Sequence, residues 1–375
     1  MFKGTKRRPT TLDISKELDS VGASYNAFTG KDYTGYYAKV PAENFSLAVD
    51  LLHDMIFHSK YSPAEMTRER KVIIEEINMY KDNPHIYIED LLEMKMFEGN
   101  TLGWSIAGTR DTMTKMKRGA LINFRDKNYV AENIVVTAAG KLPADAEKII
   151  AKKFSAVLAG ANRAVPAPFK NYVCSCGCSK VTTQFKDTQQ VQLALGFISP
   201  GSADEKGDLI ADVLGTILGG TMSSRLFIAV RERKGLAYSV KAGQGSYNDV
   251  GAFVIRAGLD KSRLKLASKV IFDELKKVKK VGVTAAELKL AKNNLIGSLK
   301  LSLEDSSTRA NFYANQELLL NKIESPEALC QRIQKITAKE IQIMANKILQ
   351  ESNMTVAGIG PFKTGKDLLK EIGLG

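Results

Sequence analysis

Apolar residues recur at helical spacing over residues 62–77, and this pattern predicts an amphipathic helix. Ser62 and Glu65 have the spacing of a capping box at its start. At about 100° per residue, one face of the helix is an apolar arc. This arc contains Met66, Val72, Ile73, Ile77 and Tyr80. Two carboxylates, Glu69 and Glu76, fall inside the same arc.

The position of these two carboxylates needs an explanation. A seven-residue step is almost two helical turns, so Glu69 and Glu76 point the same way, about 10 Å apart along the axis. An inward carboxylate is costly unless a positive group meets it. That positive group could be a metal ion, which makes both residues candidates for a functional site.

The pattern of helices and strands repeats along the chain, which indicates an internal duplication. Residues 115–140 match 335–360 at an offset of 220, and each segment predicts a helix followed by an apolar strand that ends at Gly. Residues 62–77 match 284–299 at an offset of 222. A further helix is expected in front of each member of this second pair, at 43–58 and 262–279.

The second copy lacks the two inward acids. Ala291 stands where the first copy has Glu69, and Ser298 stands where it has Glu76. If the acids were structural, the second copy would keep a polar group at both places. The comparison therefore favours a functional role for Glu69 and Glu76.

The second copy also begins with elements that the first copy does not show. Residues 189–197 alternate like a strand, and a helix is predicted over 206–218. Their counterparts would precede residue 1. We therefore expect the first copy to lack at least one strand and one helix, and the chain to be truncated at its N-terminus.

These patterns predict an α+β fold of two homologous domains. Each domain is expected to be an antiparallel β-sheet with helices packed on one face, and the two are expected to close like a clamp. We place the first domain at 1–154 and the second at 183–375. Residues 155–182 are rich in Ala, Gly and Pro and read as a linker.

Composition narrows the choice of partners. The chain has 375 residues, 44% of them hydrophobic, and a net charge of +13. No apolar run is long enough for a membrane span. The densest basic cluster, Lys276 to Lys280, reads as a solvated helix end, and no aromatic residues interleave with it. Nucleic acid binding then rests on charge alone, and we expect no nucleic acid partner and no membrane span.

Three of the four cysteines stand together, as Cys174, Cys176 and Cys178. Zinc ribbons prefer wider spacing, so the alternatives are a metal site and a reduced surface segment, and the spacing favours the second. Free thiols suggest a reducing compartment. We therefore expect a cytoplasmic protein.

Several short segments together match one known family. The segments are Phe2-Lys3-Gly4-Thr5, Asn26-Ala27-Phe28-Thr29, Arg68 to Glu76, Gly219 to Leu226 and Arg231 to Tyr238. In their order and spacing they resemble the insulinase/pitrilysin family of zinc peptidases, which includes the mitochondrial processing peptidases. The resemblance runs over essentially the whole chain.

The resemblance implies a zinc site that this sequence holds only in part. The family's inverted motif, His-x-x-Glu-His, places two histidines on one zinc and a general base between them. By family position, Glu76 would be the third ligand and Glu69 an accompanying acid. The three histidines present, His53, His58 and His85, do not form the motif. The motif would lie just before Met1, so zinc is expected as cofactor with an incomplete site.

The resemblance also implies residues that bind substrate. Asn26 and Ala27 would offer backbone groups to a peptide that lies as an added strand. Arg231 and Tyr238 would reach the substrate from the second domain, Tyr238 supporting a developing oxyanion. The alternatives are an ion pair of Arg231 with Glu232 or a neighbour, and half-buried packing of Tyr238.

Two functions follow from these observations. The first is a zinc-dependent metalloendopeptidase that cleaves peptides or unfolded segments, incomplete in this sequence. The alternative is a non-catalytic subunit that binds peptides or acts as a scaffold for an active homologue. A homologous subunit or a second copy of the chain is the expected protein partner in either case.

Overall fold

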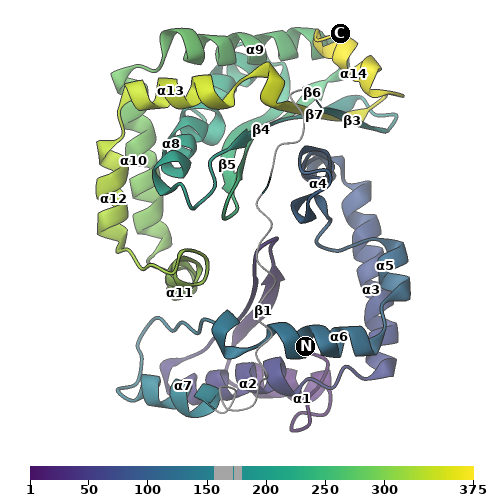
Figure 1. Ribbon diagram of the computed structural model, residues 1–375, viewed down its shortest axis with the longest axis vertical. Helices are drawn as coiled ribbons and strands as arrows, with labels where there is room; N and C mark the ends of the chain where they lie inside the picture. Colours follow the sequence, from purple (N-terminus) through teal and green to yellow (C-terminus); the bar gives the residue numbers. More distant parts are fainter. Residues whose placement is uncertain (156–171, 173–179) are drawn as a thin grey trace. The chain divides into compact units, whose positions relative to one another are not determined.

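The structure is a computed structural model that describes residues 1–155, 172 and 180–375. Most of the expected linker at 155–182, with Cys174, Cys176 and Cys178, lies outside the described residues. The chain divides into two compact units, each built from three segments (Figure 1). Unit 1 consists of Met1–Ile77, Ile106–Phe169 and Leu301–Ile323, and unit 2 of Asn78–Ser105, Lys170–Lys300 and Glu324–Gly375.

The two units differ from the expected domains in the assignment of two segments. Residues 78–105 group with unit 2, and residues 301–323 group with unit 1. The domain limits 1–154 and 183–375, which rest on the internal duplication, stay a prediction, as does the clamp.

Unit 2 is built on a five-stranded sheet with the order β3-β7-β4-β6-β5. Its strands are β3 (Lys180–Phe185), β4 (Gln190–Ser199), β5 (Ala237–Ser246), β6 (Gly251–Asp260) and β7 (Met354–Gly360). β4 pairs antiparallel with β6 and β7, and β5 pairs antiparallel with β6. The sheet is antiparallel, as expected, except at one edge, where β3 runs parallel to β7. The long chain between these two strands permits a parallel pair, which a tight hairpin could not.

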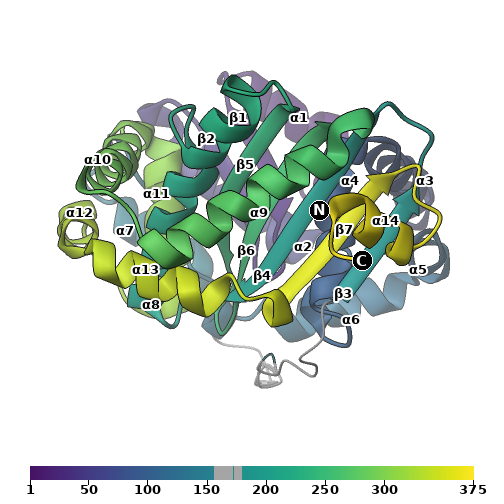
Figure 2. The ribbon, with the colours of Figure 1, turned by 90° about the horizontal axis from the view of Figure 1, so that it is seen from above.

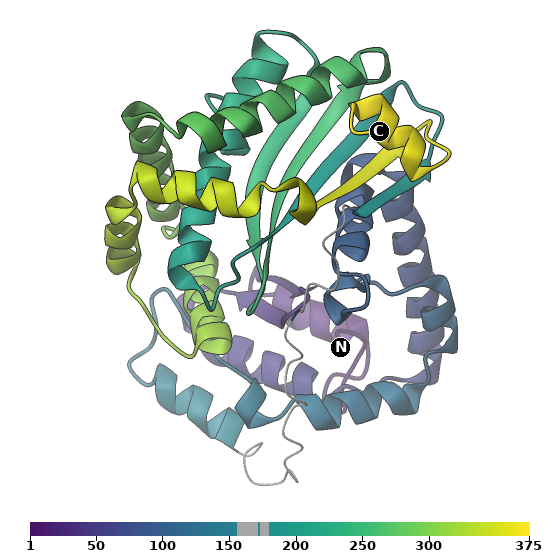
Figure 3. The same cartoon turned by 45° about the horizontal axis from the view of Figure 1, so that its top comes forward.

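Helices cover both faces of this sheet: the helices from residues 183–375 that pack on it lie on one face, as expected for the second domain, and the other face is covered by a helix from the first sequence copy. The helices of unit 2 are α4 (Pro84–Met96), α8 (Glu205–Gly215), α9 (Leu264–Val281), α10 (Ala285–Ser302, whose last two residues fall in unit 1), α12 (Pro326–Lys335), α13 (Ala338–Ile348) and α14 (Gly365–Ile372). Figure 2 shows α9 and α13 lying across one face, and α14 lies beside β3 and β7 (Figure 3). The opposite face is covered by α4.

The sequence of β4 explains the double covering. Val191, Leu193 and Leu195 face the main hydrophobic cluster, which also contains residues of α8, α9 and α13. Ala194, on the other face, packs with Ile88 of α4. Because nearly every residue of β4 is buried, the strand has no polar face to present to solvent.

Unit 1 is mainly helical. Its helices are α1 (Thr11–Asp19), α2 (Phe45–His58), α3 (Pro63–Asp82, whose last residues fall in unit 2), α5 (Arg110–Lys115), α6 (Arg118–Asn128), α7 (Ala146–Phe154) and α11 (Ser306–Asn315). Its strands β1 (Ser24–Thr29) and β2 (Thr34–Lys39) form a two-stranded antiparallel sheet. A four-residue turn, 30–33, joins the two strands.

Most predicted elements are confirmed. The helix expected at 62–77 is α3, where Ser62 accepts a hydrogen bond from the Glu65 amide at 3.3 Å. Its duplicate is α10, where the capping box of Thr284 and Glu287 is complete. The helices expected at 43–58 and 262–279 are α2 and α9, and the strand at 189–197 is β4.

One predicted element is absent from the described part of unit 1. The apolar segment that ends at Gly140 is not a strand, although its duplicate forms β7. β7 is hydrogen-bonded between β3 and β4, whereas the described part of unit 1 has only the strands β1 and β2. A strand is stable only where neighbouring strands satisfy its backbone, so sequence pattern alone could not decide this segment.

None of the helices formed by the described residues combines the length and the low charge that crossing a membrane requires.

Candidate functional site

Glu69 has the positive partner that its position on α3 demands. The Lys3 ammonium lies 3.0 Å from the Glu69 carboxylate, and the two side chains are 42% and 40% exposed. The partner comes from the first residues of the chain, not from α3 itself. Sequence reasoning assigned Lys3 only to a family segment and missed this contact. The signal that could have found it was the need of an inward acid for a cation.

A cavity of about 310 Å³ lies beside this ion pair within unit 1. Its wall is mostly apolar and rich in methionine. The lining residues are Met1, Phe2, Lys3, Gly4, Ser59, Tyr61, Glu65, Met66, Glu69, Arg70, Ile73, Met113, Met116 and Leu121. The Arg70 guanidinium is held by the carbonyl oxygens of Met113 and Met116, at 2.8 and 2.9 Å. The cavity therefore presents two carboxylates, Glu65 and Glu69, in a mostly apolar wall, and Glu69 is paired with Lys3.

Glu76 does not point into a covered region, and the expectation that it lies inward with Glu69 was wrong. Glu76 is exposed, and so are Val72 and Tyr80 of the expected arc, at 49% and 41%. The cavity walls cover α3 only as far as Ile73. Helical periodicity gives the direction of a side chain but not how far along the helix its neighbours extend.

The second copy shows the same difference between the two positions. Ala291, the counterpart of Glu69, is completely buried in α10, whereas Ser298, the counterpart of Glu76, is exposed. The position of Glu69 is thus the inner one in both copies.

Phe2 connects the surroundings of Glu69 with the strands of unit 1. Its ring lies 5.8 Å from the ring of Tyr25 and 6.5 Å from that of Tyr36. Burial raises the pKa of Tyr36, and its hydrogen bond with Tyr129, 3.1 Å between hydroxyl oxygens, raises it further. Tyr36 therefore stays a neutral hydroxyl next to Phe2 at physiological pH.

Asn26 and Ala27, the expected peptide-binding residues, follow Tyr25 on β1. They pair with Tyr37 and Tyr36 of β2. Among the described residues, β2 is the only strand that pairs with β1, so one edge of β1 has no strand beside it. The Ala27 amide donates to Oδ1 of Asn26 at 2.8 Å, so this donor is already engaged by a neighbouring side chain.

Arg231 and Tyr238 belong to unit 2 and flank a tight turn. Gly235 adopts a φ of +56°, which a residue with a side chain rarely takes. The Arg231 guanidinium stacks over the Phe227 ring at 5.0 Å. Tyr238 is 75% exposed on the edge strand β5, at a register shift between Ala237 and Ser239. Such irregularities re-aim side chains at strand edges, and here the half-buried packing considered for Tyr238 is not observed.

The described residues do not by themselves fit a zinc ion. None of them form a group of three His, Cys, Asp or Glu side chains placed to share a metal. His53 and His58 lie on α2 with ring centres 5.4 Å apart, and Asp54 faces His58. His85 lies 3.4 Å from Gln192 in unit 2. A site of the tetrahedral kind needs ligands beyond those that Glu69 and Glu76 could provide.

Comparison with known proteins identifies the family. Residues 1–110 match the family described as Insulinase (Peptidase family M16), and residues 115–295 match the Peptidase M16 inactive domain. The chain belongs to this insulinase family of peptidases, as the resemblance of its motifs implied.

Relatives with known sequences align with this chain over most of their length. A protein of Bacillus subtilis (strain 168), described as an uncharacterized zinc protease, is 34% identical over 93% of this chain and 84% of its own. A Mycobacterium tuberculosis (strain ATCC 25618 / H37Rv) protein with the same description is 34% identical over 99% of this chain and 84% of its own.

Solved structures show the fold. A protease from Helicobacter pylori superimposes with a TM-score of 0.89 at 22% identity, over 96% of this chain and 86% of its own. A peptidase M16 inactive domain from Pseudomonas fluorescens superimposes with a TM-score of 0.84 at 21% identity, over 96% of this chain and 85% of its own. The mixed helix and sheet structure thus matches the two-domain fold of this family.

Proposed function

We propose that the protein is a zinc-dependent metalloendopeptidase that cleaves peptides or unfolded segments. In this proposal Glu76 is a metal ligand and Glu69 an accompanying acid on the same helix. Residues 1–375 do not contain the histidine motif, so the proposal requires that residues outside this sequence supply it. The observation that carries the proposal is the placement of Glu69 beside an apolar cavity that the Met1–Gly4 segment helps to line.

The proposed substrate contacts are Asn26 and Ala27 on β1, and Arg231 and Tyr238 on either side of the Gly235 turn. A peptide would lie along the unpaired edge of β1 at Asn26 and Ala27, where main-chain hydrogen bonds give affinity without demanding a sequence. The exposure of Tyr238, and the position of Arg231 across the Gly235 turn, support their role as donors to the peptide.

The alternative is a non-catalytic subunit that binds peptides or supports an active homologue, including a second chain of its own kind. The absence of a three-ligand group among the described residues favours it. We propose the cytoplasm as the compartment in either case, which cell fractionation would test.

Peptide hydrolysis separates the two functions. The protein translated from the in-frame codons upstream of Met1 should cleave a fluorogenic unstructured peptide, and a zinc chelator should stop the reaction. Glu76→Gln should abolish cleavage, whereas the matched control Glu75→Gln, an exposed neighbour, should not. Cleavage that persists with chelator, or that survives Glu76→Gln, would contradict the peptidase proposal. Co-purification with an active homologue, without cleavage by this chain, would favour the alternative.

A further inference from the structure

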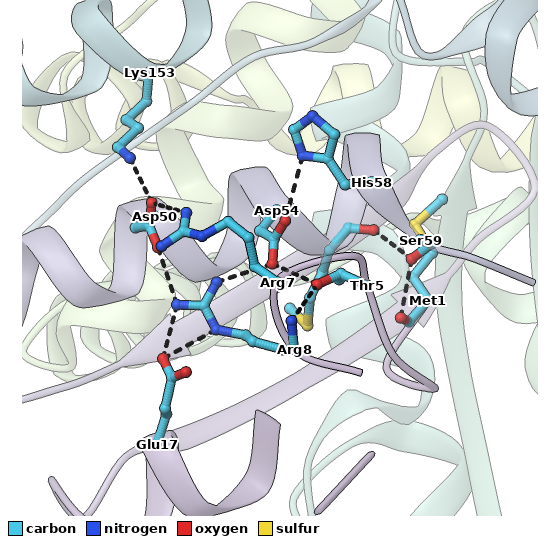
Figure 4. Close-up of polar contacts among 11 residues, drawn as sticks. Met1, Thr5, Arg7, Arg8, Glu17, Asp50, Asp54, His58, Ser59 and Lys153 are labelled. Atoms are coloured by element: carbon cyan, nitrogen blue, oxygen red, sulfur yellow. Dashed lines mark hydrogen bonds and ion pairs between the residues drawn. The ribbon is translucent and has the colours of Figure 1, made fainter. Parts of the chain in front are cut away.

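A buried arginine in unit 1 binds three carboxylates at once (Figure 4). Arg8 is 4% exposed. Its Nε and Nη2 atoms donate to Glu17 at 2.9 and 2.7 Å, Nη2 also donates to Asp50 at 2.9 Å, and Nη1 donates to Asp54 at 2.9 Å. Arg7 and Lys153 add two cations at Asp50. The cluster thus contains three carboxylates and three basic side chains, so the charge of the buried Arg8 guanidinium is compensated.

Other charged groups face the same acids. Burial opposes the ionised form of Asp50, but hydrogen bonds from Arg7, Lys153 and Arg8 outweigh it and hold the pKa of this carboxyl well below its usual range. Nδ1 of His58 lies 3.3 Å from Oδ1 of Asp54. Asp54 is 1% exposed, so its carboxylate is contacted by the groups of this cluster and not by solvent.

The cluster is connected to the backbone of the first residues. The Thr5 hydroxyl donates to Asp54 at 2.6 Å, and the Arg8 amide donates back to the Thr5 oxygen at 2.9 Å. The Thr5 amide donates to the Arg8 carbonyl at 2.7 Å, which closes a turn. Gly4 makes this turn possible, because its φ is +110° and a Cβ there would lie 2.4 Å from the Pro9 carbonyl oxygen.

The same segment is attached to the end of α2. The Lys60 amide donates to the Gly4 carbonyl at 3.1 Å, and the Ser59 hydroxyl donates to the Met1 carbonyl at 3.0 Å. These bonds fix Met1 to Thr5 as one short segment. Within it, Lys3 faces Glu69 and Phe2 faces Tyr25.

We propose that Arg8 is a positioning residue of the candidate site. Through Asp54 and Thr5 it fixes the segment Met1 to Thr5 against α3, and so sets the groups that meet Glu69. Arg8 touches none of the proposed reacting groups itself. Its relevance to catalysis rests on the proposed function, whereas its effect on the segment does not.

Hydrogen exchange tests the positioning role in the full chain. Arg8→Lys keeps the charge but loses the fork that reaches several carboxylates. It should speed exchange of the Thr5 and Lys60 amides by about tenfold or more, which is the local opening expected when their anchor loosens. Exchange in β4 of unit 2 should stay unchanged. Arg7→Lys is the matched control, because Arg7 is exposed and pairs with Asp50 alone, and it should leave both amides slow.

Three results would overturn the positioning role. The first is that Arg8→Lys leaves exchange of the Thr5 and Lys60 amides unchanged. The second is that Arg7→Lys reduces the protection of these amides as much as Arg8→Lys does. The third is that Arg8→Lys reduces protection uniformly over all of unit 1, which would indicate a general stabilising role. In the longer, active protein, Arg8→Lys should lower kcat by a larger factor than it raises KM, because Lys3 of the segment meets Glu69 directly, whereas Asn26 and Ala27 are linked to the segment only through Tyr25 and Tyr36. If the longer wild-type protein does not cleave while the exchange result holds, the peptidase proposal fails and the positioning role stands.

Discussion

At the scale of single residues, the apolar arc of α3 correctly predicted that Glu69 faces other parts of the chain, but wrongly predicted that Glu76 is covered as well. Glu69 meets Lys3, and Glu76 is exposed. The cover over α3 comes from Met1–Gly4 and from Met113 to Leu121, segments far from α3 in sequence. Periodicity along one helix carries no information on such distant neighbours. The sequence could therefore predict that Glu69 needs a cation, but not that Lys3 supplies it.

The ion pair of Glu69 contributes little to stability. Both side chains are about two-fifths exposed, so we expect Glu69→Gln to lower the free energy of unfolding by less than about 1 kcal/mol. Asp54→Asn should cost about 3 kcal/mol, because it removes one partner of a buried cation. Urea unfolding followed by circular dichroism measures both. A larger loss for Glu69→Gln than for Asp54→Asn would show that the acid is structural.

Asp212 makes stability depend on pH in an unusual direction. Burial in α8 raises its pKa to about 6, and the charge of Asp208 adds to the shift. Because this pKa lies above the unfolded value of 3.8, the folded state holds more protons between these pH values. The stability that the protonated Asp212 side chain contributes is therefore fully present at low pH and is lost as pH rises through about 4 to 6.

The variant Asp212→Asn should remove this pH dependence. Its free energy of unfolding relative to wild type should rise between pH 4 and pH 7, by about 1.4 kcal/mol for each unit of pKa shift. Urea unfolding of both proteins at the two pH values gives the difference. A difference that does not change with pH would contradict the buried acid.

At the scale of elements, two glycines control how the segment after α8 packs on β5. The predicted helix 206–218 ends as α8 at Gly215, and a π-helical turn continues to Gly220. A Cβ on Gly219 would lie 2.2 Å from the Ala242 amide nitrogen, and one on Gly215 would lie 3.0 Å from the Gly243 Cα. The family motif at Gly219 thus has a packing reason, which could not be read from sequence.

Gly219→Ala should therefore destabilise the protein by about 2 kcal/mol or more, since the backbone of β5 must move. Gly297→Ala is the matched control, because this mid-helix glycine of α10 has no atoms within 4 Å of its Cβ position. It should stabilise by about 0.5–1 kcal/mol. Thermal unfolding of the two variants gives the comparison. Equal effects would contradict the close approach of the turn to β5.

At the scale of the whole molecule, the sequence predicted two related halves but not the grouping of every helix. The duplication at an offset of about 220 residues correctly predicted α2, α3, α9 and α10. It could not show that α4 packs on the sheet of unit 2, because Ile88, Leu92 and Met96 would suit any apolar surface. Spacing identifies an apolar face, whereas only the folded chain identifies its partner.

The zinc content of the longer protein tests the central claim, that α3 carries the acidic part of a zinc site. The protein that includes the in-frame codons upstream of Met1 should hold one zinc per chain by elemental mass spectrometry. Glu76→Gln should lose most of this zinc, while Glu75→Gln keeps it. Zinc bound equally by the wild type and Glu76→Gln, or by neither, would contradict the claim.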